Sequence, residues 1–437
     1  MCSACASAPP APPPAPIGPT AAEKLSWILR LEHQRMLRDP APAPPPPAPL
    51  PVRGQQAPVV ILPPPPPDLL RLLSDGEARI RRRAALAAGR VGLREAVQPL
   101  EGVLADADPE VRQMAAFALG LIGDRGARDS LVAALGDPSP LVKGSAAEAL
   151  GMIGDVSAAE AIGQMASAIV QSGVLAPPPG DADDARRDTP AAAFRLGIYA
   201  LVKLKAYLPL AAAVLDPSGQ PRVTWWPVAY ALQRIDDARA LPALTTLAGD
   251  AQPYTRAFAI KGLGRAMNRA AVPLLLPLAA GPDRIAAIEA VRALGRIGDP
   301  AAAPALLTLI QAPKGDPVLR VEAASAIGGV GGAGVFDALI DILSDRDPLV
   351  RAAVLRSLAA VDREGFMLTL SALDPDPDWS VRAALASVLG SLSPESALPR
   401  LRTMMSDADQ RVVAAALASL ARLGPPDAAD LLLESIS

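Results

Sequence analysis

The stretch "DADPEVRQMAAFALGLIGD", residues 106–124, recurs in variant form along most of the chain. Close copies occupy residues 136–155, 346–362 and 377–393. When the copies are aligned, the glycine of "ALG" or its substitute returns every 31 residues, apart from one step of 33 and one of 51. This position holds Gly89, Gly120, Gly151, Gly264, Gly295, Gly328 and Gly390, and Val202, Gln233, Ala359 and Ala421 in the other copies. The sequence therefore contains eleven repeats, with one insertion.

Each repeat predicts two helices. In the first, apolar residues such as Val111, Ala115 and Leu119 recur at helical spacing, "GD" ends the helix, and a shorter apolar helix follows. A single pair of this kind has an apolar face that it cannot bury alone, so the pairs must stack. A hydrophobic content of 51% with only 3% aromatic residues favours closely packed helices over strands. We predict an all-α fold: a right-handed α-solenoid of about eleven two-helix repeats over residues 68–437.

Residues 1–67 differ in composition from the repeats. They hold 21 of the 49 prolines, in blocks at 9–19 and 40–67, and such segments favour extended polyproline II and cannot form a packed core. Between the blocks, residues 21–39 have apolar side chains at helical spacing and predict one amphipathic helix, with His33 on its solvated side. We therefore predict a Pro-rich, largely disordered leader that carries one helix.

An aspartate precedes an arginine by six residues in many of the repeats. The pairs are Asp75/Arg81, Asp106/Arg112, Asp250/Arg256, Asp345/Arg351 and Asp376/Arg382, with Asp137/Lys143 as a near match. This pattern resembles HEAT repeats, and most closely the short phycobilisome-lyase-like (PBS lyase HEAT-like) type. The resemblance implies a structural ladder in which the aspartate caps a helix and the arginine bonds to the neighbouring repeat, in agreement with capping chemistry. Nothing in the sequence marks a bilin pocket, so the resemblance does not carry lyase chemistry.

The inventory of reactive side chains is small. His33 is the only histidine, and the only cysteines are Cys2 and Cys5, which removes the usual zinc sites, Cys–His nucleophiles and Ser–His–Asp triads. The formal net charge is −3, so no global field draws the protein to nucleic acid or to anionic membrane. We predict a chain that is not an enzyme and binds no cofactor or metal. The alternative is an accessory subunit of an enzyme, lyase-like or associated with a prolyl isomerase.

The N-terminus leaves two interpretations open. "CSACASAPPAPPPAP", residues 2–16, resembles the end of a bacterial lipoprotein signal in which Cys5 is lipidated. If translation begins upstream of Met1, we expect a cell-envelope lipoprotein held to the membrane by its lipid anchor. If Met1 is the true start, we expect a disordered tail on a cytoplasmic protein. No apolar run in the sequence is long enough to span a bilayer.

The repeat pattern changes around one insertion. Residues 171–190 form a polar, Pro-rich segment, and directly after it Phe194 and Trp225 replace the ladder arginine in two successive repeats. Eight of the thirteen aromatic residues, including every tyrosine, fall within residues 194–258. We predict that Trp225 packs the joint beside the insertion, and that Pro227 kinks its helix or marks the first turn.

The sequence also predicts a binding strip on repeats four to seven. The position six residues after the conserved valine is polar in most repeats and is expected to face solvent, yet Tyr199 and Tyr230 occupy it in two of them. Residues four positions apart share a helical face. The resulting rows are Arg195, Tyr199 and Lys203; Trp226, Tyr230 and Arg234; Lys261 and Arg265 with Phe258; and Arg292 and Arg296. Trp, Tyr and Arg are enriched at binding hot spots, whereas the simpler interpretation is that they fill space and complement helix dipoles.

The chemistry of the strip indicates the class of its partner. Cations and aromatic side chains together suit a protein or peptide that is acidic or Pro-rich. The Pro-rich leader is itself a candidate for docking on the strip, which is a hypothesis of self-binding. Stacking aromatics among cations also suit single-stranded nucleic acid, but the net charge argues against it.

Overall fold

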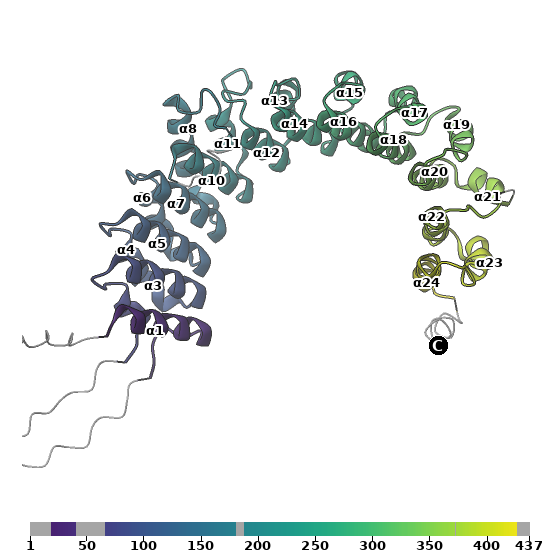
Figure 1. The fold of residues 1–437 in the computed structure, drawn as a ribbon. Helices are drawn as coiled ribbons and strands as arrows, with labels where there is room; N and C mark the ends of the chain where they lie inside the picture. The colour runs from purple at the N-terminus through teal and green to yellow at the C-terminus, as the bar shows by residue number, and fades with distance from the viewer. Residues whose placement is uncertain (1–18, 41–65, 181–187, 372, 426–437) are drawn as a thin grey trace, which may run out of the picture. The chain divides into compact units, whose positions relative to one another are not determined.

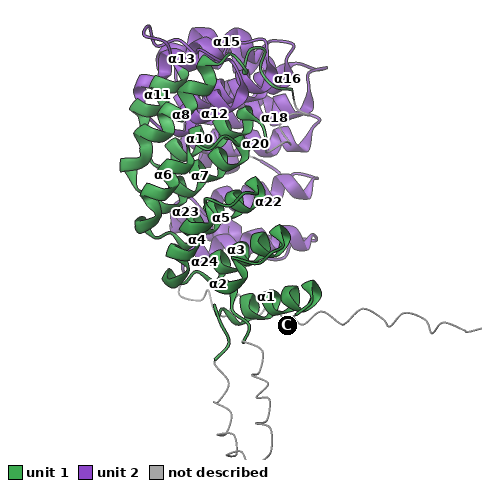
Figure 2. Ribbon diagram, turned by 90° about the vertical axis from the view of Figure 1, so that its left-hand side faces the viewer, with its two compact units in different colours: residues 1–214 green, residues 215–437 purple. Residues whose placement is uncertain are grey.

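The chain divides into two compact helical units. The computed structural model describes residues 19–40, 66–180, 188–371 and 373–425. The units span residues 1–214 and 215–437 (Figure 2). Within the described residues there is no strand, only the isolated bridges between Arg38 and Asp68 and between Leu215 and Pro221. The predicted all-α fold is confirmed.

The first unit stacks helix pairs in two layers (Figure 1). The first helix of each repeat packs on the first helix of the next, α3 on α5, α5 on α7 and α7 on α10, and the second helices form the other layer. The helices are α1 (Ala21–Gln34), α2 (Leu69–Leu72), α3 (Ala78–Val91), α4 (Val97–Val103), α5 (Pro109–Ile122), α6 (Arg128–Ala134), α7 (Pro140–Ile153), α8 (Ala159–Gln171), α10 (Pro190–Lys203) and α11 (Tyr207–Val214).

The second unit repeats this arrangement from α12 to α24 (Figure 1). Its helices are α12 (Trp226–Arg234), α13 (Leu241–Leu247), α14 (Pro253–Arg265), α15 (Val272–Ala279), α16 (Arg284–Ile297), α17 (Ala303–Gln311), α18 (Pro317–Val330), α19 (Val335–Ile342), α20 (Pro348–Val361), α21 (Arg363–Ser371), α22 (Trp379–Leu389), α23 (Pro394–Met404) and α24 (Gln410–Leu423). In the two units together, a short 3-10 turn precedes the second helix of six repeats, at Arg94–Ala96, Arg125–Ala127, Val156–Ala158, Ala238–Ala240, Arg269–Ala271 and Pro300–Ala302. Each of the eleven predicted repeats has its first helix among the described residues.

Local sequence signals fix where the first helices begin and end. Asp108 caps α5 by accepting the backbone N–H of Glu110 at 2.8 Å, and Pro109 occupies the first turn, where its missing N–H costs nothing. Gly123 then ends the helix with φ of 74°, a conformation that glycine adopts without a steric penalty. The end of α12 differs, because Asp236 takes φ of 58° in the corresponding place.

Small residues allow the first helices to approach closely. A Cβ atom added to Gly120 would lie 2.7 Å from the Cα atom of Ala149 on α7, and one on Gly264 would lie equally close to the Cα atom of Ala293 on α16. Contacts this short leave no room for a larger side chain at the glycine position. The aligned glycine of the repeat is therefore a helix-packing residue, which explains its regular return.

The helix predicted within the leader belongs to the first stack. It spans Ala21–Gln34 instead of residues 21–39, and Thr20 and Glu23 form a capping box at its start. Its Ile28 is fully buried, and α1 packs against α3. Lys24 forms an ion pair with Asp75 at 2.6 Å. The Pro-rich segment that separates α1 from the first repeat hid this relation in the sequence.

Candidate partner-binding surface

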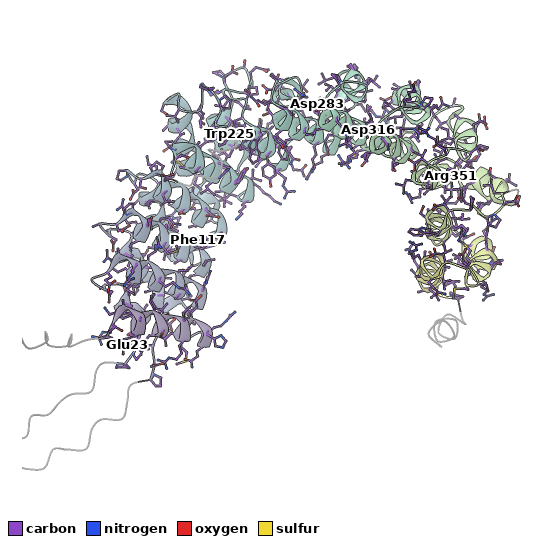
Figure 3. All side chains as sticks on the ribbon, in the orientation of Figure 1. Glu23, Phe117, Trp225, Asp283, Asp316 and Arg351 are labelled. Carbon is purple, nitrogen blue, oxygen red and sulfur yellow. The ribbon has the colours of Figure 1, made fainter. Side chains whose placement is uncertain are left out.

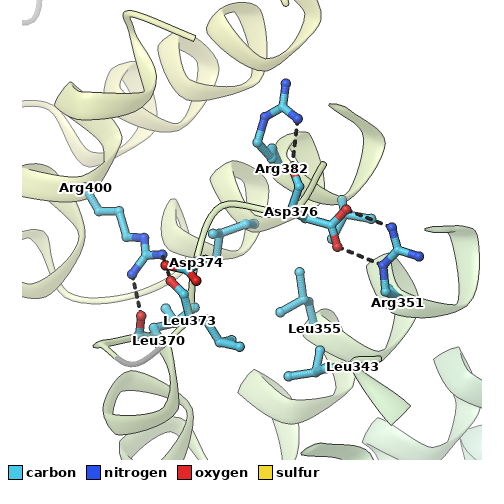
Figure 4. A pocket seen from close by; sticks show the side chains of 11 residues that line it. Leu343, Arg351, Leu355, Leu370, Leu373, Asp374, Asp376, Arg382 and Arg400 are labelled. Carbon is cyan, nitrogen blue, oxygen red and sulfur yellow. Dashed lines mark hydrogen bonds and ion pairs between the residues drawn. The ribbon is translucent and has the colours of Figure 1, made fainter. Parts of the chain in front are cut away.

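Arginines of one repeat bind aspartates of the next and form rungs between neighbouring first helices. Arg112 donates from Nε and Nη2 to the two carboxylate oxygens of Asp137, at 2.7 and 2.9 Å, and from Nη1 to the carbonyl of Asp106 at 2.9 Å. Arg351 holds Asp376 in the same way (Figure 4). The rungs are Arg81–Asp106, Arg112–Asp137, Arg256–Asp283, Arg320–Asp345, Arg351–Asp376 and Arg382–Asp407.

The expected role of the ladder aspartate as a helix cap is wrong in detail. Asp106 accepts the backbone N–H of Asp108 at 2.9 Å, and it is Asp108 that caps the helix. The hydrogen bond from Arg81 holds the pKa of Asp106 below its usual value, so the carboxylate stays ionised to lower pH than that of a free aspartate. Lys143 forms no ion pair within the described part of the chain. Arg320 also forms a rung. The six-residue spacing did not identify it, because Lys314 instead of an aspartate lies six residues before Arg320.

Aromatic residues replace the rung beside the insertion. Phe194 on α10 is fully buried, and Trp225 is 3% exposed at the N-cap of α12 (Figure 3). The chain is extended at Trp225, so α12 has nine residues and Pro227 lies in its first turn without a kink. Between α12 and α14 the buried hydroxyl of Thr255 donates to the carbonyl of Thr224 at 2.9 Å. The α12–α14 joint thus has a buried apolar side chain at the position where six other joints have an Arg–Asp rung.

Three half-buried aromatic side chains form one cluster across α12 and α14. Trp226 stacks on Phe258 with ring centroids 5.7 Å apart and an interplanar angle of 29°. Tyr230 meets Phe258 edge to face, at 5.4 Å and 85°. Such contacts contribute about 0.5–1.5 kcal/mol each beyond area burial. Trp226, Tyr230 and Phe258, here called the aromatic cluster, are therefore an ordered surface whose side chains remain partly open to solvent.

Basic side chains lie on the same helices as the aromatic cluster and on α16. Arg234, Arg265 and Arg296 are exposed and Lys261 is half-buried, and none of the four forms an ion pair with another described residue. Arg292 differs from them, because it binds Glu322 and also Glu289 at 2.9 Å, and the hydrogen bonds that it donates to Glu322 raise its pKa. The charge of Arg292 is neutralised within the protein, so the predicted strip is weaker there.

The predicted strip divides between the two units. Arg195 and Tyr199 on α10 are half-buried and Lys203 is exposed, and all three lie in the first unit. The other eight predicted residues lie in the second unit, where the structure brings Trp226, Tyr230 and Phe258 into contact.

The face on which the strip lies is the solvent face of the first helices. At the position equivalent to Tyr230, Ser325, Arg356 and Ser387 are exposed. The same position on α5 holds Phe117, which is half-buried (Figure 3), and Leu121 one turn later is 39% exposed. The predicted strip did not include this second apolar patch, although Phe117 lies six residues after Val111, the same spacing that identified Tyr230.

The remaining predictions concern metal sites, membrane spans, the leader and the inserted segment. Within the described ranges, no group of three or more His, Cys, Asp or Glu residues could hold a metal ion. None of the helices in those ranges is both long and apolar enough to cross a membrane. Cys5 and most of each Pro-rich block of the leader lie outside the described residues, as does part of the inserted segment after α8.

Stacked two-helix repeats joined by Arg–Asp rungs define an α-solenoid repeat protein. HEAT repeats match residues 102–169, 244–318, 308–365 and 367–437, which together exceed half of the chain. The chain belongs to the HEAT-repeat family, as the sequence predicted. No curated protein matches the chain.

Solved structures show the same fold at low sequence identity. Kap121p bound to Nup53p has a TM-score of 0.53 at 14% identity, over 84% of this chain and 46% of that one. Kap121p bound to Pho4p has the same TM-score, identity and coverage. This chain therefore spans less than half the length of Kap121p. The complex of CpcE and CpcF of phycocyanin lyase from Nostoc sp. PCC7120 has a TM-score of 0.31 at 21% identity, over 67% of this chain and 93% of that one, which is too low to carry a conclusion.

Proposed function

We propose that this protein is a non-catalytic scaffold that binds a protein or peptide partner on the solvent face of α12 and α14. The aromatic cluster carries the proposal. Three aromatic side chains are held in fixed mutual orientation and remain partly exposed, with Arg234, Lys261 and Arg265 on the same two helices. Ordered aromatic side chains beside arginines are the usual composition of a binding hot spot.

The charges around the cluster favour a partner with acidic residues. The carboxylates of such a partner would pair with Arg234, Lys261 and Arg265, while its apolar or proline side chains would cover the aromatic rings. Kap121p, which has the same fold, is bound to Nup53p in one structure and to Pho4p in another, a precedent for binding of other proteins by this architecture. Binding of this kind is expected to weaken as salt concentration rises.

The test compares partners captured by the wild-type chain and by the double variant Trp226→Ala/Tyr230→Ala. We expect the double variant to lose specific partners, and the Kd of a purified partner measured by calorimetry to rise at least about tenfold. Trp379→Ala is the matched control, because Trp379 is also half-buried and is also the first residue of its helix, α22. Equal partner sets for the wild type and the double variant would refute the proposed surface.

A further inference from the structure

A cavity of about 240 Å³ lies at the C-terminal ends of α12 and α14. Its polar lining consists of Gln233, Asp236, Asp237 and Arg265, and its apolar lining includes Leu241 and Leu244 of α13. Arg265 also belongs to the basic surface beside the aromatic cluster, so the cavity adjoins the proposed binding surface. The repeat array provides an internal reference for each position of this cavity.

Two residues that line the cavity, Gln233 and Gly262, reverse the usual order of side-chain size at a contact between first helices. In other joints the aligned glycine packs against an alanine or serine of the next first helix, as Gly264 does against Ala293. In the α12–α14 joint, Gln233 replaces the glycine and Gly262 replaces the alanine. A Cβ atom on Gly262 would lie 2.7 Å from the Cβ atom of Gln233, so the glycine makes room for the glutamine. The pair places a polar side chain inside a joint that is otherwise closed by small residues.

The carboxamide oxygen of Gln233 has no hydrogen-bond partner in the described part of the chain. Gln233 is 5% exposed, and its fully buried Oε1 atom accepts no hydrogen bond from any described residue. A buried acceptor without a donor costs about 1–3 kcal/mol. Gly and Ala in this joint would avoid the cost, as they do in the α14–α16 joint. The glutamine is therefore positioned to accept a hydrogen bond from a molecule that enters the cavity.

Acidic groups surround this acceptor. Asp236 has φ of 58°, where several other repeats have glycine, and its exposed side chain lines the cavity without an ion pair to any described residue. Asp237 also lines it, while Arg239 pairs with Asp237 from outside the lining. The unsatisfied carbonyls at the end of α12 add partial negative charge. Because Arg239 already neutralises Asp237, the groups that favour a cation in the cavity are the Asp236 carboxylate, Oε1 of Gln233 and the carbonyls at the end of α12, against the single guanidinium of Arg265.

We propose that this cavity binds one cationic side chain, a lysine or arginine, of the protein partner. The ammonium or guanidinium group donates hydrogen bonds to Oε1 of Gln233 and to the carboxylate of Asp236, and the methylene stem packs on Leu241 and Leu244. The partner then presents carboxylates to the basic surface and one basic side chain to the cavity. This inference rests on the proposed function for the source of the side chain, but the cavity's chemistry is testable without the partner.

The experiment uses the full chain labelled with ¹⁵N-glutamine and three small probes. Nα-acetyl-lysine methylamide and Nα-acetyl-arginine methylamide carry the cation, and Nα-acetyl-norleucine methylamide is the neutral control. We expect at least one cationic probe to shift the side-chain NMR signal of Gln233 saturably, with a Kd of the order of millimolar, and the norleucine probe to leave it in place. The signal is assigned by its loss in Gln233→Met, which is of similar size and apolar.

Variants separate cavity binding from other effects. Measured at a signal outside the cavity or by calorimetry, probe binding should be lost in Gln233→Met and weakened about tenfold or more in Asp236→Asn. It should persist in Gln113→Met, where the altered glutamine is half-buried on α5 and bonded to Ser145. It should also persist in Trp226→Ala/Tyr230→Ala, so failure of the cavity and failure of the partner surface are distinguishable.

Three results would overturn the inference. Equal shifts with the norleucine probe would show that the cation is not recognised. Binding that survives Gln233→Met would place the probe elsewhere. A water molecule held by Oε1 of Gln233 in a crystal structure, with no displacement by any probe at saturating concentration, would show that solvent alone satisfies the acceptor. Thermal unfolding followed by circular dichroism verifies that each variant is folded, and the double variant Gln233→Gly/Gly262→Ala, which restores the repeat pattern, should abolish probe binding in a folded chain.

Discussion

The joint between α5 and α7 and the joint between α12 and α14 each hold the first helices of two successive repeats together, but they do so with different side chains. At the first, Arg112 bridges to Asp137 and Gly120 packs on Ala149. At the second, Trp225 stands in place of the arginine, and Gln233 and Gly262 replace the glycine and the alanine. The α12–α14 joint also carries the aromatic cluster and the cavity. The repeat array therefore accommodates an irregular joint, and this joint carries a surface that the α5–α7 joint lacks.

The two joints respond differently to perturbation because their interiors differ. A rung holds its helices through charge-assisted hydrogen bonds that require an ionised carboxylate. A buried tryptophan acts through apolar area and packing, which are insensitive to pH. Each repeat contacts mainly its neighbours, so local protection from hydrogen exchange reports the joint that is altered.

The largest effect is expected for Trp225→Ala. Removing a side chain that is 3% exposed leaves a cavity in the α12–α14 joint and should cost about 3–5 kcal/mol. Hydrogen exchange followed by mass spectrometry should show faster exchange in peptides from α12 and α14, with α5 and α7 unchanged. Phe117→Ala is the matched control, because Phe117 is half-buried on the solvent face and should cost less. Exchange that rises equally in all repeats would contradict a local role for Trp225.

A smaller effect is expected for Arg112→Ala in the regular joint. The variant leaves Asp137 and the carbonyl of Asp106 without their donor in a site where the arginine is 13% exposed, and should cost about 2–3 kcal/mol. Exchange should rise in α5 and α7. Arg79→Ala removes an exposed pair with Glu77, in which the arginine is 63% exposed, and should cost less than about 1 kcal/mol. Equal costs for the two variants would show that the rung is an ordinary surface ion pair.

The regular joint was largely predictable from the sequence, whereas the changed joint was predictable only in part. The 31-residue recurrence defines the helices, and an Asp–Arg spacing of six locates most rungs. That spacing could not show that the arginine binds the aspartate of the next repeat, because this contact is 25 residues distant in sequence. Gln233 was visible as an exception to glycine. Its burial and its missing partner depend on Gly262 of another helix, and so required the structure.

Acidification should weaken the regular joints more than the α12–α14 joint. The hydrogen bond from Arg81 lowers the pKa of Asp106, and that from Arg382 lowers the pKa of Asp407. A carboxyl group whose pKa is lower in the folded than in the unfolded state contributes its full stabilisation at pH values above the unfolded-state pKa. This contribution to stability is lost as the pH falls through the folded-state pKa. From about pH 4 downward, exchange protection should fall in α3, α5, α22 and α24 relative to α12, which has no rung to either neighbouring first helix among the described residues.

A variant of the rung verifies the origin of this acid response. In Arg81→Ala the pKa of Asp106 loses its main cause of lowering, so the protection of α3 and α5 should be smaller at neutral pH and should change less on acidification. An acid response of unchanged steepness in this variant would assign it to other carboxyls.

The smallest effect is the most specific to the changed joint, because it concerns two residues that fit each other. Gly262→Ala alone should destabilise the protein by about 1–2 kcal/mol, since the new Cβ would lie 2.7 Å from Gln233 Cβ and 2.9 Å from a methyl of Leu244. Gln233→Gly alone removes the orphaned acceptor but adds a helix glycine, and the two terms nearly cancel. Together the changes restore the packing of the regular joint, so the double variant should be more stable than the sum of the single effects predicts, with a coupling of about 1–2 kcal/mol in a double-mutant cycle. Chemical denaturation of the four proteins measures it. Additive effects would mean that glutamine and glycine were not fitted to each other, and the cavity would then be an incidental gap beside an exposed loop.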